Sequence, residues 1–97
     1  MIYHITALSS WETSLILGFY EADSLATEGF IHASNRKQVE GALERYYKNQ
    51  TDLVLLHIDE TKLTAALKYE LSPSINELFP HIYGPVNIDA VIHTTAI

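Results

Sequence analysis

The chain has 97 residues, of which 47% are hydrophobic, and a formal net charge of −6. This length and apolar content fit a single domain, residues 1–97, with its own core, and they exclude a disordered chain. Twelve acidic residues against six Lys and Arg make broad nucleic-acid binding unfavourable, because the field of the chain repels phosphate backbones.

The chain contains no cysteine, which excludes disulfides, thiolate nucleophiles and sulfur ligands for metals. Its first residues carry neither a basic segment nor a long apolar run, so we expect no signal peptide and no membrane span. These features predict a cytoplasmic protein.

The first part of the chain predicts a strand and then a helix. Residues 2–6 alternate in polarity and predict the strand. Ser9 and Glu12 form a capping-box pattern, which predicts a helix over about residues 10–18. Turn-forming residues follow, so residues 20–26 are expected to be irregular.

A second strand and a second helix are predicted next. The strand covers residues 28–34, after a glycine break. Ser34 or Asn35 would cap the helix, whose apolar side chains recur at i, i+3, i+4, i+7 and i+8 up to about Lys48.

The second half of the chain predicts mostly strands. Residues 53–58 are apolar on both faces, as in the central strand of a sheet. Residues 67–71 alternate until Pro73 stops them. A helical turn is predicted at residues 74–78 and a closing strand at residues 88–93. Early helices and late strands indicate an α+β domain, with two early helices packed on mostly antiparallel sheets.

A short segment near the C-terminus, Phe79–Pro85, holds two polar rings between two prolines. The prolines restrict the backbone and Gly84 permits a turn, so we expect a rigid loop. An extended backbone would project His81 and Tyr83 to the same side, where they could bind a ligand. A structural turn with a half-buried tyrosine is the alternative.

Two further histidines stand as polar residues in apolar strands. His4 shares a strand face with Thr6, and His32 shares one with Ser34. Polar stripes of this kind line clefts in small domains, and solvent-facing histidines are the alternative. His57 is expected to be held by a backbone carbonyl inside the central strand.

A metal site is not expected. None of the five histidines has local ligand spacing, and His93 is assigned to the surface. A ligand set would arise only if four groups converged in space: His4, His32, His81 and Glu70.

Two charged residues complete the candidate site. Glu70 lies on the polar face of its strand and could act as a general base or stabilise positive charge on a ribose. Arg36 opens the second predicted helix, where it could contact a phosphate beside the helix amides. Plain surface roles are the alternatives for both residues.

The sequence resembles a bacterial family of unknown function, the one numbered 952, over nearly the whole chain. The resemblance rests on the following stretches: residues 3–6, Trp11, Tyr20, Leu25, residues 28–34, 38–39 and 51–53, Leu63, residues 68–70 and residues 78–85.

That family is in turn similar in fold to the ADP-ribosyltransferase superfamily. The similarity implies a small ADP-ribosyltransferase-like domain in which His4, on the first strand, binds the ribose of NAD. It also implies that residues 30–34 lie near the nicotinamide. The superfamily has a late glutamate, for which Glu70 is the counterpart here unless His81 and Tyr83 replace it.

Two hypotheses follow for the function. The first is an enzyme that binds or cleaves NAD, ADP-ribose or a related nucleotide. The second is a non-enzymatic module that binds a small ligand or a protein. For the first, the expected catalytic residues are His32, Glu70 and His81, and the expected cofactor-binding residues are His4, Ser34, Arg36 and Tyr83. The first hypothesis predicts that His4, His32 and His81 meet in one pocket.

Overall fold

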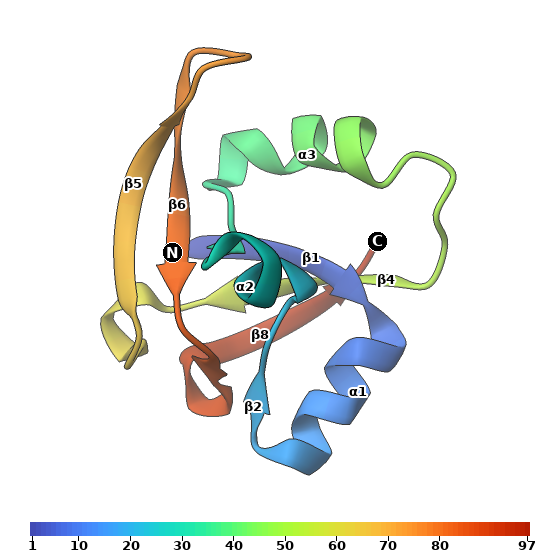
Figure 1. Cartoon of the computed structure of the whole chain (residues 1–97). Coiled ribbons are helices and arrows are strands. Elements are labelled where there is room, and N and C mark those ends of the chain that lie inside the picture. The colour runs from blue at the N-terminus through green and yellow to red at the C-terminus, as the bar shows by residue number, and fades with distance from the viewer.

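Three antiparallel sheets form the framework of the computed structural model, which describes residues 1–97 (Figure 1). Their strand orders are β1-β4-β8, β2-β7 and β3-β6-β5. The elements in chain order are β1 (Ile2–Ala7), α1 (Leu8–Leu17), β2 (Phe19–Tyr20), α2 (Asp23–Glu28), β3 (Ile31–His32), η1 (Arg36–Gln38), α3 (Val39–Tyr46), β4 (Leu53–Ile58), η2 (Glu60–Lys62), β5 (Ala66–Ser72), β6 (Glu77–Tyr83), β7 (Val86–Asn87), η3 (Ile88–Ala90) and β8 (Val91–Ala96). The α+β class and the mostly antiparallel sheets agree with the sequence-based prediction.

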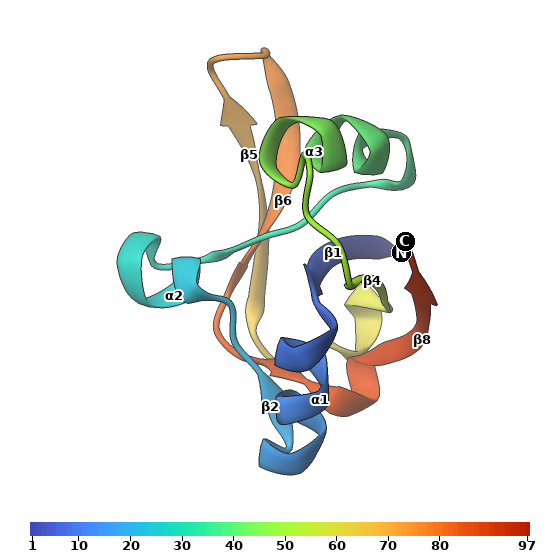
Figure 2. The same cartoon turned by 90° about the vertical axis from the view of Figure 1, so that its right-hand side faces the viewer.

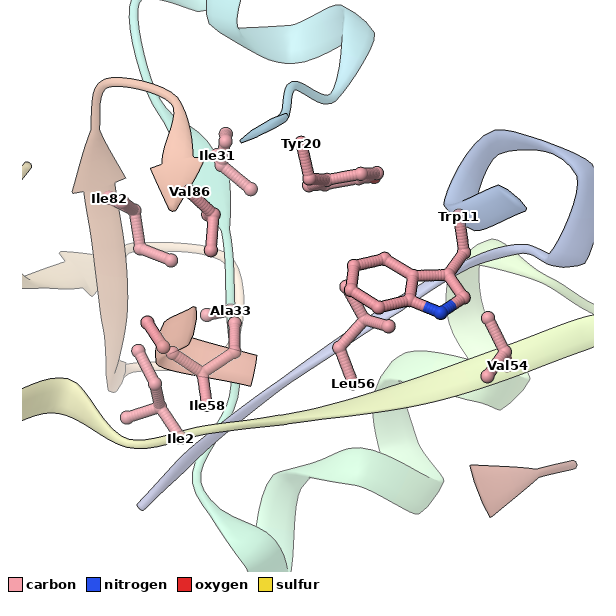
Figure 3. Packing of buried hydrophobic residues seen from close by; sticks show 11 residues of the cluster. Ile2, Trp11, Tyr20, Ile31, Ala33, Val54, Leu56, Ile58, Ile82 and Val86 are labelled. Carbon is pink, nitrogen blue, oxygen red and sulfur yellow. The ribbon is translucent and has the colours of Figure 1, made fainter. Parts of the chain in front are cut away.

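The core lies on both faces of β4, which is the central strand that the sequence predicts. One face carries Val54, Leu56 and Ile58 into a cluster of eleven buried residues that includes Trp11 and Ile82 (Figure 3). The other face packs under α3 through a second cluster: Ile5, Val39, Ala42, Leu53 and Leu55. Because successive side chains of a strand alternate between faces, a strand that is apolar throughout can serve both clusters.

Helix α1 does not begin at the predicted capping box. It starts at Leu8, its N-cap residue is Ala7, and no side chain caps it. The strand β1 runs directly into the helix, and the Leu8 amide donates to the carbonyl of Asp52 at 2.8 Å. A carbonyl of the neighbouring loop therefore satisfies one of the four amides that the start of a helix leaves free.

The prediction of an irregular segment at residues 20–26 was wrong. Tyr20 belongs to β2, and α2 follows and ends at Gly29, which has a φ of 90°. Figure 2 shows α2 at one edge of the molecule, away from the sheet that contains β4. A short helix that contributes no buried residue has little apolar pattern, so the sequence signal for it was weak.

The second helix follows its predicted cap. The side chain of Asn35 accepts from the Gln38 amide, and the side chain of Gln38 accepts from the Asn35 amide, both at 3.0 Å. This capping box opens the short helix η1, which continues into α3. Helix α3 ends at Tyr46, two residues before the predicted end at Lys48.

Phe79–Pro85 is mostly a strand, which corrects the predicted loop and the helical turn before it. Strand β6 covers Glu77–Tyr83 and forms a hairpin with β5 through the turn at residues 73–76. Pro80 is tolerated in the strand because of the side that its backbone faces. Its carbonyl accepts from the Ala33 amide at 3.0 Å, so its nitrogen also faces the side of β3 and not that of β5. Strand β3 has already ended at His32, so no strand residue there needs an amide from position 80. The proline therefore removes no hydrogen bond to β5.

The strand predicted at residues 28–34 is shorter than expected, since Glu28 belongs to α2 and Gly29 caps that helix, and the residues after them are divided between two sheets. Only Ile31 and His32 pair with β6. Ser34 instead pairs with Tyr3 through two backbone hydrogen bonds of 2.8 Å, so the segment crosses from β6 to β1. This crossing brings β1, β3 and β6, which carry the three site histidines, next to one another.

The closing strand, predicted from residue 88, begins later, because the short helix η3 occupies Ile88–Ala90 and β8 starts at Val91. None of the helices combines the length and the hydropathy that a membrane crossing requires.

Candidate functional site

A cleft of about 790 Å³ opens between β1, α2, α3 and the β5–β6 hairpin. Four of the seven predicted site residues line it: His4, His32, Ser34 and His81. The other three, Arg36, Glu70 and Tyr83, do not line it. The condition that three histidines from distant parts of the sequence share one pocket is therefore met.

His4 lies at the inner end of this site and is only 6% exposed. Its Nδ1 lies 2.5 Å from the carbonyl oxygen of His32, and its Nε2 lies 2.7 Å from the hydroxyl of Tyr20. Burial lowers the pKa of His4 from 6.5 to about 4, so the ring is neutral at pH 7.

The neutral state of His4 determines the direction of each hydrogen bond in this group. A carbonyl only accepts, so Nδ1 carries the proton and Nε2 accepts from Tyr20. The single proton of Tyr20 is then used, so the 2.9 Å contact between the Tyr20 and Thr6 hydroxyls has Thr6 as its donor. Both nitrogens of His4 are occupied, and its binding of a ribose stays a prediction.

His81 forms a dyad with Glu70. Its Nδ1 lies 3.0 Å from Glu70 Oε1, and the hydroxyl of Tyr83 donates to the same oxygen. Hydrogen bonds from Tyr83 and then His81 lower the pKa of Glu70, and the same contact raises the pKa of Tyr83. Because a carboxylate only accepts, Nδ1 donates and a neutral ring keeps a free lone pair on Nε2.

Phe30 fixes the plane of the His81 ring. The two rings stack with centroids 4.0 Å apart and planes 15° apart. The side chain of His81 is 14% exposed, so a rigid and nearly buried base stands at the wall of the cleft. The resemblance implied that residues 30–34 lie near a nicotinamide, but the stacking of Phe30 on His81 was not predicted.

His32 stands directly opposite His81 in the β3–β6 pairing, with ring centroids 5.5 Å apart. Its Nε2 lies 3.0 Å from Glu28 Oε2, and both side chains are half exposed. The rim of the cleft therefore carries two histidines, each with its own carboxylate. Glu28 was missed because α2 was not predicted and Glu28 was assigned to the same strand as His32.

The remaining predicted residues lie at the edge of this arrangement. Ser34 is 7% exposed and lines the cleft. Arg36 lies exposed in η1, whose Gln38 amide is already taken by Asn35. Its predicted contact with a phosphate beside the helix amides therefore has one amide fewer than expected.

The histidines do not form a metal-ligand set, because no group of three His, Cys, Asp or Glu side chains is placed to hold an ion. His57 bonds the Thr95 hydroxyl at 2.7 Å, where a backbone carbonyl was expected. It also meets His93 edge to face at 4.8 Å, outside the cleft.

Solved structures of one other protein are similar to this chain. The crystal structure of protein CC0527 from Caulobacter crescentus has a TM-score of 0.88 and 29% sequence identity, and the match covers 97% of this chain and 82% of that chain. The solution NMR structure of CC0527 gives a TM-score of 0.84 at 29% identity, over 99% of this chain and 83% of that chain.

No curated protein matches the chain. The model of the family described as protein of unknown function (DUF952) matches residues 5–94. This match spans nearly the whole sequence, including the segments around His32 and His81, and the chain therefore belongs to that family.

Proposed function

We propose that the chain binds NAD, ADP-ribose or a related nucleotide by inserting a ring and its ribose into the cleft. The observation that carries this proposal is the meeting of His4, His32 and His81 at one cleft of about 790 Å³. That volume lies within the range of small-molecule sites, which combine apolar and aromatic walls with a few convergent polar groups. A cytoplasmic location and an ADP-ribosyltransferase-like fold belong to the same proposal.

The dyad of His81 and Glu70 supports an enzymatic version of this function. A histidine whose Nδ1 is held by a carboxylate can take a proton at Nε2 from water or from a ribose hydroxyl. Glu70 itself lies outside the cleft, so its role here is to orient His81 rather than to contact the sugar. His32, at the half-exposed rim, would be the second proton-transfer group.

Isothermal titration with NAD, ADP-ribose and nicotinamide tests the proposal. We expect saturable binding that is strongly weakened by His32→Ala. His93→Ala is the matched control, because His93 is exposed and does not line the cleft, and it should leave binding unchanged. The absence of heat with all three compounds at millimolar concentration contradicts the proposal.

A non-enzymatic binding module is the second candidate, favoured by two positions. His4 has both ring nitrogens occupied, and Glu70 does not line the cleft. The residue that the resemblance assigns to the ribose, His4, therefore has no free ring nitrogen, and the counterpart of the late glutamate, Glu70, is not at the cleft. This candidate predicts binding without turnover, and free nicotinamide released from labelled NAD would exclude it.

A further inference from the structure

We propose that the part of the ligand that enters the cleft is a positively charged, flat heterocycle, while any phosphate groups stay outside. This inference rests on the proposed function, since it assumes that the cleft is the ligand site. It follows from the charges, the rings and one free hydroxyl that line the cleft.

Every acidic or basic side chain along the cleft, apart from the histidines, is a carboxylate: Glu21, Asp23 and Glu28. Glu28 is paired with His32, whereas Glu21 and Asp23 have no ion-pair partner. Both of these free carboxylates are exposed beside the cleft. A cationic ligand would meet two uncompensated negative charges there, and a phosphate would be repelled by them.

Two basic residues, Arg45 and Lys68, each lie near a tyrosine ring, and neither lines the cleft. The guanidinium of Arg45 lies on α3 beside Gly41, 5.7 Å from the centre of the ring of Tyr46, which does line the cleft. The ammonium of Lys68 lies 5.0 Å from the centre of the Tyr83 ring, which does not line the cleft. No lysine or arginine lines the cleft, and the net charge of −6 adds to the repulsion of anions.

Aromatic rings supply the second part of the recognition. Six aromatic side chains besides the histidines line the cleft: Tyr3, Tyr20, Phe30, Tyr46, Tyr47 and Phe79. The faces of such rings carry partial negative charge and attract organic cations. Carboxylates and tyrosine rings together therefore favour a positively charged heterocycle over a phosphate group.

Ser34 gives independent evidence that something polar binds here. It is more than nine-tenths buried and lines the cleft, and its hydroxyl has no hydrogen-bond partner within the chain. Every fully enclosed polar side-chain atom of the protein does have a partner, so the Ser34 oxygen remains reachable from the cleft. A buried hydroxyl that is left free at a cleft wall suits a ligand that completes its hydrogen bonding.

The test is a titration with nicotinamide riboside, which is cationic, adenosine, which is neutral, and AMP, which is anionic. We expect nicotinamide riboside to bind about tenfold or more tightly than AMP, and NAD to bind more tightly than ADP-ribose. Raising NaCl from 20 to 300 mM should weaken the binding of nicotinamide riboside, because salt screens the attraction of exposed charges. Ser34→Ala should weaken it as well.

Two matched double variants isolate the charge effect. Glu21→Gln with Asp23→Asn should lower the affinity for nicotinamide riboside by about two- to fivefold per carboxylate and leave adenosine unchanged. Glu12→Gln with Glu44→Gln removes two exposed charges that do not line the cleft, and it should have little effect.

The outcomes separate this inference from the function beneath it. If AMP and ADP-ribose bind more tightly than nicotinamide riboside, the inference is overturned and the nucleotide cleft stands. If the two double variants act alike, the inference also fails. If none of the compounds binds, the proposed function fails and the inference with it.

Discussion

His4 in β1 donates its Nδ1 proton to the backbone carbonyl of His32 in β3 across 2.5 Å. One predicted site histidine thus holds the strand that carries another. The contact joins residues 28 positions apart in the sequence, at the place where the chain crosses from one sheet to the other. This relationship makes His4 a support of the cleft wall, and it leads to predictions that need no ligand.

His4→Gln should destabilise the fold by about 2–3 kcal/mol, since it disturbs two buried hydrogen bonds and can leave the Tyr20 hydroxyl or the His32 carbonyl unpaired. Urea denaturation measures this loss. His93→Gln, at an exposed position, is the control and should change stability by less than about 0.5 kcal/mol. Equal effects of the two variants would show that the buried network adds nothing.

The same histidine should make stability depend on pH. Burial lowers the pKa of His4 from 6.5 to about 4. Between pH 6.5 and 4, His4 is therefore protonated in the unfolded chain but stays neutral in the folded chain. The free energy of unfolding is therefore unaffected by His4 above pH 6.5, and it falls by roughly 3 kcal/mol as the pH drops towards 4. Chemical denaturation at several pH values measures the slope.

Controls separate His4 from other groups in that pH window. Burial, and then the neighbouring His93, also lowers the pKa of His57, which contributes with the same sign, so His57→Gln should remove only part of the slope. Hydrogen bonds lower the pKa of Glu70, whose contribution is lost only as the pH falls through its own depressed pKa. A slope between pH 6.5 and 5 that survives His4→Gln unchanged argues against the buried neutral ring.

Local patterns were sufficient to predict the elements with strong periodicity. The strand β4 and the Asn35 cap were predicted correctly, because a strand buried on both faces requires apolar residues throughout and a helix cap requires a short polar side chain. The start of α1 was missed because its first amide bonds to Asp52, a partner far away in sequence. Such tertiary partners leave no local signal.

The site was predictable in part for the same reason. A shared strand face linked His32 to Ser34, and His81 to Tyr83, and the structure keeps His81 and Tyr83 together on Glu70. The sequence alone did not show that His4 would be enclosed, because its burial depends on Tyr20 and on the crossing of residues 31–34. Phe79–Pro85 was misassigned because a proline normally argues against an inner strand.

Two glycines should respond to alanine in opposite directions. Gly29 ends α2 at a φ of 90°, with open space around a would-be Cβ, so Gly29→Ala should cost about 1 kcal/mol through backbone strain alone. Gly41 is helical, and its Cβ would meet only the mobile end of Arg45 at 2.9 Å. Gly41→Ala should therefore stabilise the chain by about 0.5–1 kcal/mol, by thermal or urea unfolding. A loss of stability at Gly41 would mean that Arg45 cannot move aside.

The link between Glu70 and Tyr83 predicts a shift in one tyrosine. The Glu70 carboxylate accepts from the Tyr83 hydroxyl and raises its pKa above the ordinary value of 10.0, because this hydrogen bond favours the protonated phenol and the negative charge of Glu70 adds to the effect. Glu70→Gln should therefore lower the pKa of Tyr83 towards 10.0, as followed by NMR of ring-labelled tyrosine over the pH range in which the chain stays folded. Glu77→Gln changes an exposed carboxylate on the same hairpin and should leave Tyr83 unmoved. If the two variants give the same tyrosine titration, Glu70 does not bind the Tyr83 hydroxyl, and the arrangement in which Glu70 holds both His81 and Tyr83 is contradicted.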